Sequence, residues 1–173
     1  MIELRVAVRP RWVFRLPRHG GLDRLTQVRG GVLHRLLWAG EEPVVVRVAQ
    51  PARDQVLFGA VAGDRGPAEW AIARMRFALG VDQDLRPFYE RFRSDPLIGR
   101  SVRADPGLRA TGAPEPFQAL AWAICEQLIE AERAASIQRR LVATLGRRCP
   151  VGGMRGAPSA AVLAAAAPAL LES

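Results

Sequence analysis

The residues able to do metal or nucleophilic chemistry are few in this chain and scattered along it. The two histidines, His19 and His34, have no partner histidine or cysteine at metal-site spacing, so structural roles are favoured. The two cysteines, Cys125 and Cys149, form no CxxC pair. Cys125 lies beside an apolar stripe, which suits a small core residue better than a nucleophile. The pattern therefore predicts no metal site and no cysteine nucleophile.

The carboxylates also occupy positions that suit structure better than catalysis. Four aspartates lie in expected turns or at expected helix starts, where a carboxylate accepts hydrogen bonds from free backbone N–H groups. They are Asp82, Asp84, Asp95 and Asp105. We assign no catalytic residue among them.

Arginine supplies all of the basic side-chain charge. The chain has no lysine and carries a formal net charge of +8. Codon usage in a GC-rich genome explains arginine in place of lysine, but it does not explain the excess of base over acid. Guanidinium groups bind phosphates in bidentate fashion, so this charge favours a nucleic-acid partner.

Length and composition indicate a globular chain with one domain or two small ones. The 173 residues are 49% hydrophobic and 24% charged, an ordinary globular composition. No signal-peptide pattern opens the sequence, and no apolar run reaches the ~18 residues of a membrane span. We expect a cytoplasmic protein without membrane contact.

A helix pair is predicted between Gly112 and Gly146. Pro114 and Pro116 fit the first turn of a helix, and Gly146 is expected to end the second helix in a left-handed conformation. Each helix has one apolar stripe at steps of three and four residues, which predicts a face packed on a core. The stripes comprise Phe117, Leu120, Ala121, Ile124 and Leu128, and then Ala134, Ile137, Leu141 and Leu145.

The residues before this pair predict a small sheet with a covering helix. Strand-like runs at 2–8, 31–38, 43–49 and 55–61 are separated by turn-like segments, which favours an antiparallel meander. A short helical turn is predicted at 22–28. A helix is expected from about residue 67 to Leu79, with Trp70 and Phe77 packing on the sheet.

Beyond residue 82 the strand patterns give way to helices. Asp84 is expected to cap a helix with Leu85, Phe88 and Phe92 facing inward, and a second short helix follows at 96–103. Ser159 is placed to cap an Ala-rich helix. The prediction is an α+β chain, with a sheet-plus-helix domain at 1–82 and an all-helical part at 83–173.

Several of these residues resemble those of the helix-hairpin-helix DNA glycosylases, and most of all the 3-methyladenine DNA glycosylase II type. The resemblance includes Pro-Gly-Leu-Arg at 106–109, Phe117 and Ala-Ile-Cys-Glu-Gln-Leu-Ile at 123–129. The family has a Gln followed by an apolar residue in Ile-x-x-Gln-x-Val-Ser, matched here by Gln127 and Leu128. Ile129-Glu130 replaces the usual Val-Ser. The resemblance spans roughly residues 85–171.

The resemblance implies a function and a set of site residues. It implies a sheet domain related to half of the TATA-binding-protein fold, followed by the first helices of the glycosylase domain. Such enzymes act as monomers on double-stranded DNA with damaged bases, flip the base and break its N-glycosidic bond, without a metal or a redox cofactor. By position, Leu128 is the wedge that fills the vacated stack and Gln127 is its polar neighbour. Among the arginines of 133–148, Arg133 is the candidate for a phosphate contact.

Other interpretations remain open for these residues. Leu128 also fits the core stripe, Gln127 an exposed helix surface, and Arg133 an ordinary solvated helix face. Trp12 and Phe14 suit either an aromatic wall for a base or core packing.

The resemblance also stops short of the family's hairpin and catalytic Asp. We therefore expect residues 1–173 to be the N-terminal portion of a DNA glycosylase of base excision repair. We expect this portion to be inactive alone. The alternative functions are a non-catalytic DNA-binding or interaction module, and a basic α+β protein unrelated to DNA.

Overall fold

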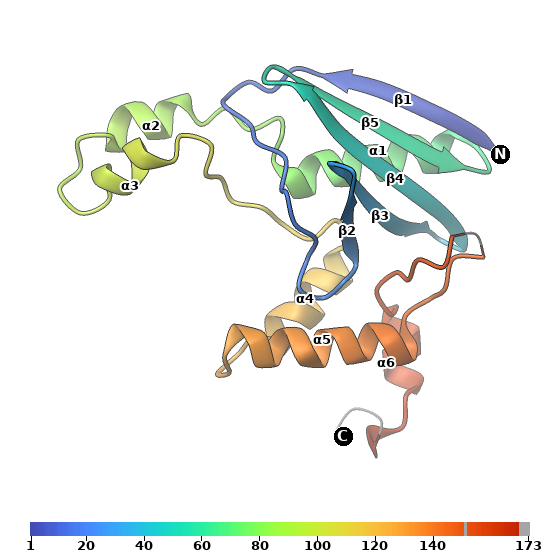
Figure 1. Cartoon of the computed structure of the whole chain (residues 1–173). Helices are drawn as coiled ribbons and strands as arrows, with labels where there is room; N and C mark the ends of the chain where they lie inside the picture. Colours follow the sequence, from blue (N-terminus) through green and yellow to red (C-terminus); the bar gives the residue numbers. More distant parts are fainter. Residues whose placement is uncertain (151, 170–173) are drawn as a thin grey trace.

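The chain forms a five-stranded antiparallel sheet, with α1 on one face and α4, α5 and α6 gathered below it (Figure 1). The computed structural model describes residues 1–150 and 152–169. The strand order is β1-β5-β4-β3-β2. The strands are β1 (Ile2–Val8), β2 (Thr26–Arg29), β3 (Val32–Ala39), β4 (Glu42–Ala52) and β5 (Gln55–Ala62). The predicted α+β class is confirmed.

Tight turns set the register of the predicted meander. Ala39 pairs with Glu42 and Ala52 pairs with Gln55, so two residues close each of these hairpins. The helical turn predicted at 22–28 is wrong, because residues 26–29 form β2. The adjacent Gly30 and Gly31 have φ of 56° and 75°, and a two-residue turn of this kind folds β2 back onto β3.

Helix α1 (Arg65–Leu79) covers the sheet, but not through the predicted residues. Asp64 accepts a hydrogen bond from the backbone N–H of Arg65, and Gly80 ends the helix with φ of 61°. Trp70 and Phe77 were predicted to pack inward, yet both are partly exposed. The sheet instead contacts a face rich in small residues, which lets the helix approach closely. The buried residues are Ala68, Ala71, Ile72, Met75, Ala78 and Leu79.

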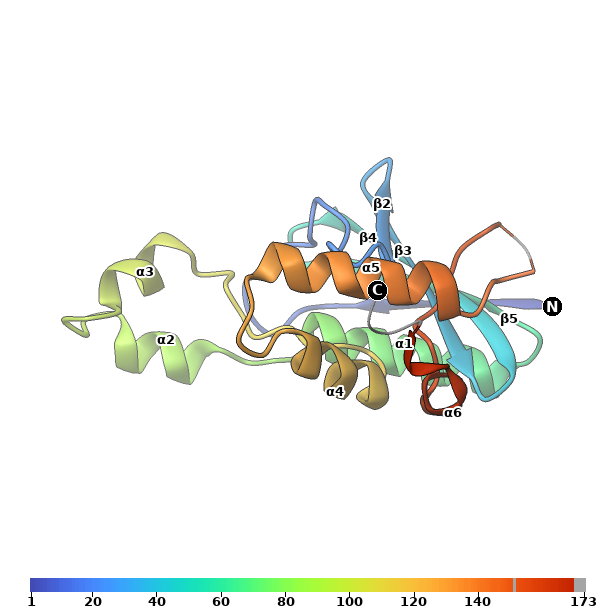
Figure 2. The ribbon, with the colours of Figure 1, turned by 90° about the horizontal axis from the view of Figure 1, so that it is seen from below.

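Helices α2 (Arg86–Phe92) and α3 (Gly99–Ala104) form an arm that projects away from the sheet (Figure 2). Asp84 accepts a hydrogen bond from the backbone N–H of Arg86, as a capping residue would. The inward face predicted from Leu85, Phe88 and Phe92 is wrong, because Tyr89 is the buried residue of α2. Its hydroxyl donates to the carbonyl oxygens of Asp105 at 2.7 Å and Leu108 at 3.1 Å.

The predicted stripes on α4 (Pro116–Cys125) and α5 (Ala131–Leu145) need correction. On α4, Leu120 and Ile124 are about 60% exposed, and the buried residues are Gln118 and Trp122. On α5 the buried face is shifted from the predicted stripe. It comprises Ala134, Ala135, Gln138 and Val142. Polar partners of Gln118, Trp122 and Gln138 select these faces.

The segment after α5 folds back toward the sheet and leads into α6 (Ala160–Ala165). Ser159 caps α6 as predicted, accepting a hydrogen bond from the backbone N–H of Val162. Gly146 has φ of −66° and is not left-handed, so that prediction is wrong. A Cβ there would lie 2.4 Å from the carbonyl oxygen of Val142 and 2.6 Å from that of Gly156. Close backbone approach is what requires glycine at 146.

Candidate nucleic-acid interface

The turn between α4 and α5 presents Leu128 to solvent. The last backbone bonds of α4 run from the N–H of Glu126 to the carbonyl of Trp122 and from the N–H of Gln127 to that of Ile124. Leu128 then has φ of 61°, in the left-handed region that costs most L-residues roughly 1–2 kcal/mol. Its relative exposure is 104%, so Leu128 is not a member of the core stripe.

Hydrogen bonds with buried side chains hold the α4 side of this turn. Glu126 accepts a hydrogen bond at 2.9 Å from Nε2 of Gln138, which is buried on α5. Trp122 is buried and donates from Nε1 to Oδ2 of Asp23 at 2.8 Å. A strained residue persists only where its surroundings hold it, and such residues gather at functional sites. The turn therefore extends from a hydrogen-bonded helix end and presents one exposed apolar side chain.

Gln127 precedes Leu128 directly and Arg133 follows it by five residues, and both are exposed. Arg133 belongs to the first turn of α5, so the three predicted site residues share the end of the helix pair nearest the α2–α3 arm (Figure 2). Two later arginines already have structural partners. Arg139 donates to the carbonyl of Leu22 at 3.1 Å, and Arg147 forms a 2.6 Å ion pair with Glu41.

A buried ion cluster joins the sheet to the start of α4. Arg35 on β3 is 2% exposed and donates from Nη2 to Oε1 of Gln118 at 2.5 Å. The same Nη2 lies 4.0 Å from Oε2 of Glu115. Burial raises the pKa of Glu115, while the charge of Arg35 acts in the opposite direction. Because Arg35 needs polar partners, the face of α4 that carries Gln118 turns toward the sheet.

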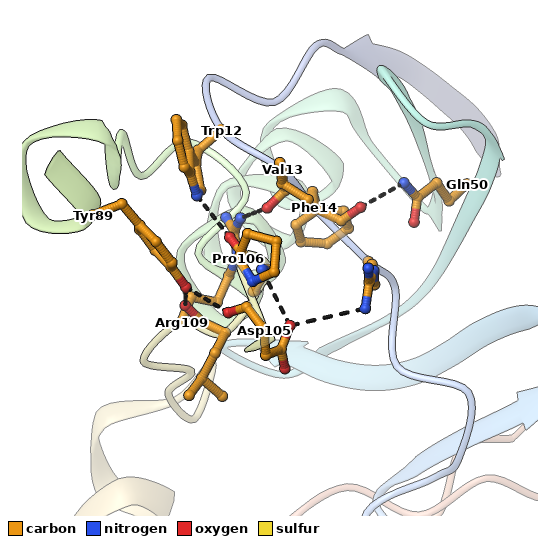
Figure 3. A network of polar contacts seen from close by, with 11 residues as sticks. Trp12, Val13, Phe14, Gln50, Tyr89, Asp105, Pro106 and Arg109 are labelled. Atoms are coloured by element: carbon orange, nitrogen blue, oxygen red, sulfur yellow. Dashed lines mark hydrogen bonds and ion pairs between the residues drawn. The ribbon is translucent and has the colours of Figure 1, made fainter. Parts of the chain in front are cut away.

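Trp12 and Phe14 serve packing. Phe14 is 4% exposed within the core, and Trp12 donates from Nε1 to the carbonyl of Pro106 at 2.7 Å (Figure 3). Arg109 lies over the Phe14 ring, 5.0 Å from its centroid, and donates to the carbonyls of Gly80 and Val13. The Pro-Gly-Leu-Arg segment thus binds the connector between β1 and β2 and leads on into α4. The sequence predicted no role for Arg109, whose place in the Pro-Gly-Leu-Arg segment was its only signal.

The described residues contain no group of three or more His, Cys, Asp or Glu side chains placed to hold a metal ion. Burial lowers the pKa of His34, and the charges of Arg47 and Arg29 lower it further. Burial, followed by the charge of Glu126, raises the pKa of Cys125, which makes this thiol a poor nucleophile at neutral pH. No helix in residues 1–150 and 152–169 is long and apolar enough to cross a membrane.

Proteins that resemble this chain in sequence and in fold include DNA glycosylases. The DNA-3-methyladenine glycosylase of Bacillus subtilis (strain 168) is 27% identical over 124 residues, which cover 69% of this chain and 41% of that protein. The 3-methyladenine DNA-glycosylase from Archaeoglobus fulgidus superposes with a TM-score of 0.77 at 15% identity, covering 91% of this chain and 57% of that one. The predicted resemblance to the DNA glycosylases is confirmed.

A DNA complex has the same glycosylase fold. The Clostridium acetobutylicum 8-oxoguanine glycosylase/lyase, bound to double-stranded DNA with cytosine opposite 8-oxoG, superposes with a TM-score of 0.62 at 16% identity. That alignment covers 88% of this chain and 50% of the other. No protein-family model matches the chain. By these coverages, the chain spans about half the length of the glycosylases that it resembles.

Proposed function

We propose that this chain is the N-terminal part of a DNA glycosylase that excises alkylated bases of the 3-methyladenine type. The observation that carries the proposal is Leu128, a fully exposed leucine in a left-handed conformation between α4 and α5. A base that leaves the stack leaves a gap, and apolar side chains inserted between base steps can fill it. Leu128 is placed for that insertion, with Gln127 as its polar neighbour and Arg133 available for a phosphate.

The turn lowers the cost of insertion because it is already ordered. Gln138 and Asp23 fix the two helices on either side, so binding does not need to order this backbone. The apolar side chain is exposed in the free protein and gains burial only between base pairs. A rigid turn of this kind supports a wedge better than a mobile loop.

Duplex binding with a steep salt dependence is the first expected result. Each phosphate contact contributes about −0.9 to the slope of log K against log salt concentration. With a net charge of +8, we expect a slope of about −3 or steeper for undamaged duplex, measured by fluorescence anisotropy. A slope near zero, or no binding at low salt, would contradict a role on DNA.

The described carboxylates support a further part of the proposal, that residues 1–173 hold the wedge but not the catalytic acid. Glycosidic cleavage needs a fixed carboxylate near the developing positive charge of the sugar. Near the turn, Asp23 and Glu126 accept hydrogen bonds within the fold. At the other end of α4, Glu115 is half-buried beside Arg35. Glu130 and Glu132 are solvent-exposed, where water weakens such stabilisation.

We therefore expect no release of 3-methyladenine from alkylated DNA by residues 1–173 at saturating protein. The engaged carboxylates also favour the second candidate function, a non-catalytic DNA-binding module. The assay separates free base from DNA by chromatography, with an active 3-methyladenine glycosylase as the positive control. Multiple-turnover release would show that a carboxylate of this chain acts as the catalytic group.

A further inference from the structure

Half of the chain's net charge lies in the connector between β1 and β2. Residues 9–24 include five arginines and one acid, Asp23, which gives a formal charge of +4 against +8 for the whole chain. Asp23 is already engaged, since it accepts hydrogen bonds from the indole of Trp122 and the backbone N–H of Leu25. The five arginines are Arg9, Arg11, Arg15, Arg18 and Arg24.

The connector is held in an extended form that turns arginines outward. Trp12, Phe14 and Leu16 face the protein, and the residues between them, Val13 and Arg15, are exposed. Gln50 on β4 pairs with the connector backbone in both directions, and Figure 3 draws its bond to Phe14. Its Nε2 donates to the carbonyl of Phe14 at 2.9 Å, and its Oε1 accepts from the N–H of Leu16 at 2.8 Å. The arginines therefore extend from a fixed backbone.

An open groove of about 790 Å³ runs between this connector and the β4–β5 hairpin. Three arginines line it, Arg15 and Arg18 from the connector and Arg53 from the hairpin turn, and no acidic residue is among its described lining residues. Within the described residues, neither Arg18 nor Arg53 forms an ion pair with a carboxylate. Arg15 lies 3.8 Å from Asp105, and both side chains are about half exposed or more. Such a pair leaves the positive charge largely available.

The groove suits a chain of phosphates better than a compact apolar ligand. It is open to solvent, and its charged groups are guanidinium forks, which bind phosphate oxygens in bidentate fashion. The arginines follow one another along an extended connector, as phosphate charges follow one another along a nucleic-acid strand. The backbone of a nucleic acid is the ligand of this shape and charge.

The groove also lies within reach of a duplex bound at Leu128. Leu22 follows Arg18 by four residues, at most about 14 Å of chain. The carbonyl of Leu22 accepts a hydrogen bond from Arg139, and Arg139 lies about 12 Å along α5 from Ala131. With the length of the Arg139 side chain, Arg18 is within roughly 35 Å of the turn, about ten base pairs at 3.4 Å each.

We propose that this groove binds the sugar–phosphate backbone of the duplex that flanks the base at Leu128. The inference rests on the proposed function, because it takes DNA as the ligand. It adds a contact surface on the sheet side of the molecule, separate from the α4–α5 turn. The residues that carry it are Arg15, Arg18 and Arg53.

The test is the salt dependence of duplex binding by the double variant Arg18→Gln and Arg53→Gln. Loss of two phosphate contacts should make the slope of log K against log salt shallower by about 1.8. The matched control is Arg5→Gln with Arg65→Gln, two exposed arginines on β1 and at the start of α1. The control removes the same charge and should keep the wild-type slope to within about 0.5.

The outcomes separate this inference from the proposed function. A wild-type slope in the Arg18/Arg53 variant, or an equal change in both double variants, would overturn the groove as a contact. A wild-type protein without duplex binding would instead overturn the proposed function itself. Arg18→Lys with Arg53→Lys should restore most of the slope, and a wild-type melting temperature in each variant shows that the fold is intact.

Discussion

Replacing Leu128 with alanine should weaken binding to a duplex that contains an abasic site by about 10- to 100-fold. Burying a leucine side chain contributes about 1.5–3 kcal/mol, and each 1.4 kcal/mol is a factor of ten in affinity. The abasic site provides the gap without the cost of flipping a base, so the affinity reports insertion directly. Leu128 is fully exposed in the free protein, so its loss should leave the melting temperature unchanged.

Leu120→Ala is the matched control for this substitution. Leu120 is 58% exposed on α4, and the change removes the same atoms outside the turn. We expect it to change abasic-site affinity by less than about two-fold, which corresponds to about 0.4 kcal/mol. Equal weakening by both substitutions would mean that Leu128 acts as general apolar surface and not as a wedge.

Arg35→Met should lower the free energy of unfolding by about 3 kcal/mol or more, because it removes a buried guanidinium and leaves the half-buried Glu115 without its charge partner. For a chain of this length that corresponds to a fall of roughly 6 °C or more in melting temperature. The loss should also disturb the seating of α4, since Gln118 loses its donor. Thermal unfolding followed by circular dichroism measures the change.

The pH dependence of the Arg35→Met variant follows from Glu115. Its pKa is already raised in the folded protein by burial, and removing Arg35 takes away an opposing charge. A carboxyl with a higher pKa in the folded than in the unfolded protein binds more protons in the folded state. The free energy of unfolding therefore falls as pH rises through the folded-state pKa. The variant should therefore lose less stability relative to wild type at about pH 5 than at about pH 8.

The double variant Arg35→Met with Glu115→Gln is the control for this explanation. A neutral amide has no charge to leave uncompensated, so the double variant should recover part of the lost stability and lose its pH dependence. An Arg35→Met variant with the wild-type melting temperature at both pH values would show that the cluster contributes nothing to the fold.

Much of the fold follows from local patterns, whereas the packed faces do not. Alternating apolar residues and two-residue turns predict β1, β3, β4 and β5, and Asp64 and Gly80 mark the ends of α1. The helix faces follow from distant partners. Arg35 selects Gln118, and Asp23 selects Trp122, across more than 80 residues of sequence each. Apolar periodicity takes no account of such polar partners, so Leu120 and Ile124 were assigned to the core.

The candidate site shows the same division between local and distant information. The resemblance to a known motif identified Gln127 and Leu128, although the helical period ran through Leu128 and favoured a core position. The left-handed Leu128 follows a helix end held by the bond between Gln138 and Glu126, which no local pattern encodes. The division of the chain at residues 82 and 83 remains a proposal, and Leu25 packs with Trp122 and Val142 in one small core.

Entry of Leu128 into the base stack is tested most directly by 2-aminopurine fluorescence. This base is quenched when stacked, so its emission rises when its neighbour is displaced or the base itself is flipped. With 2-aminopurine beside the lesion position and protein at saturation, we predict a clear rise for wild type and for Leu120→Ala. Leu128→Ala should give little rise, even when anisotropy shows that all of the duplex is bound. An equal rise with Leu128→Ala, or no rise with saturating wild type, would contradict the wedge.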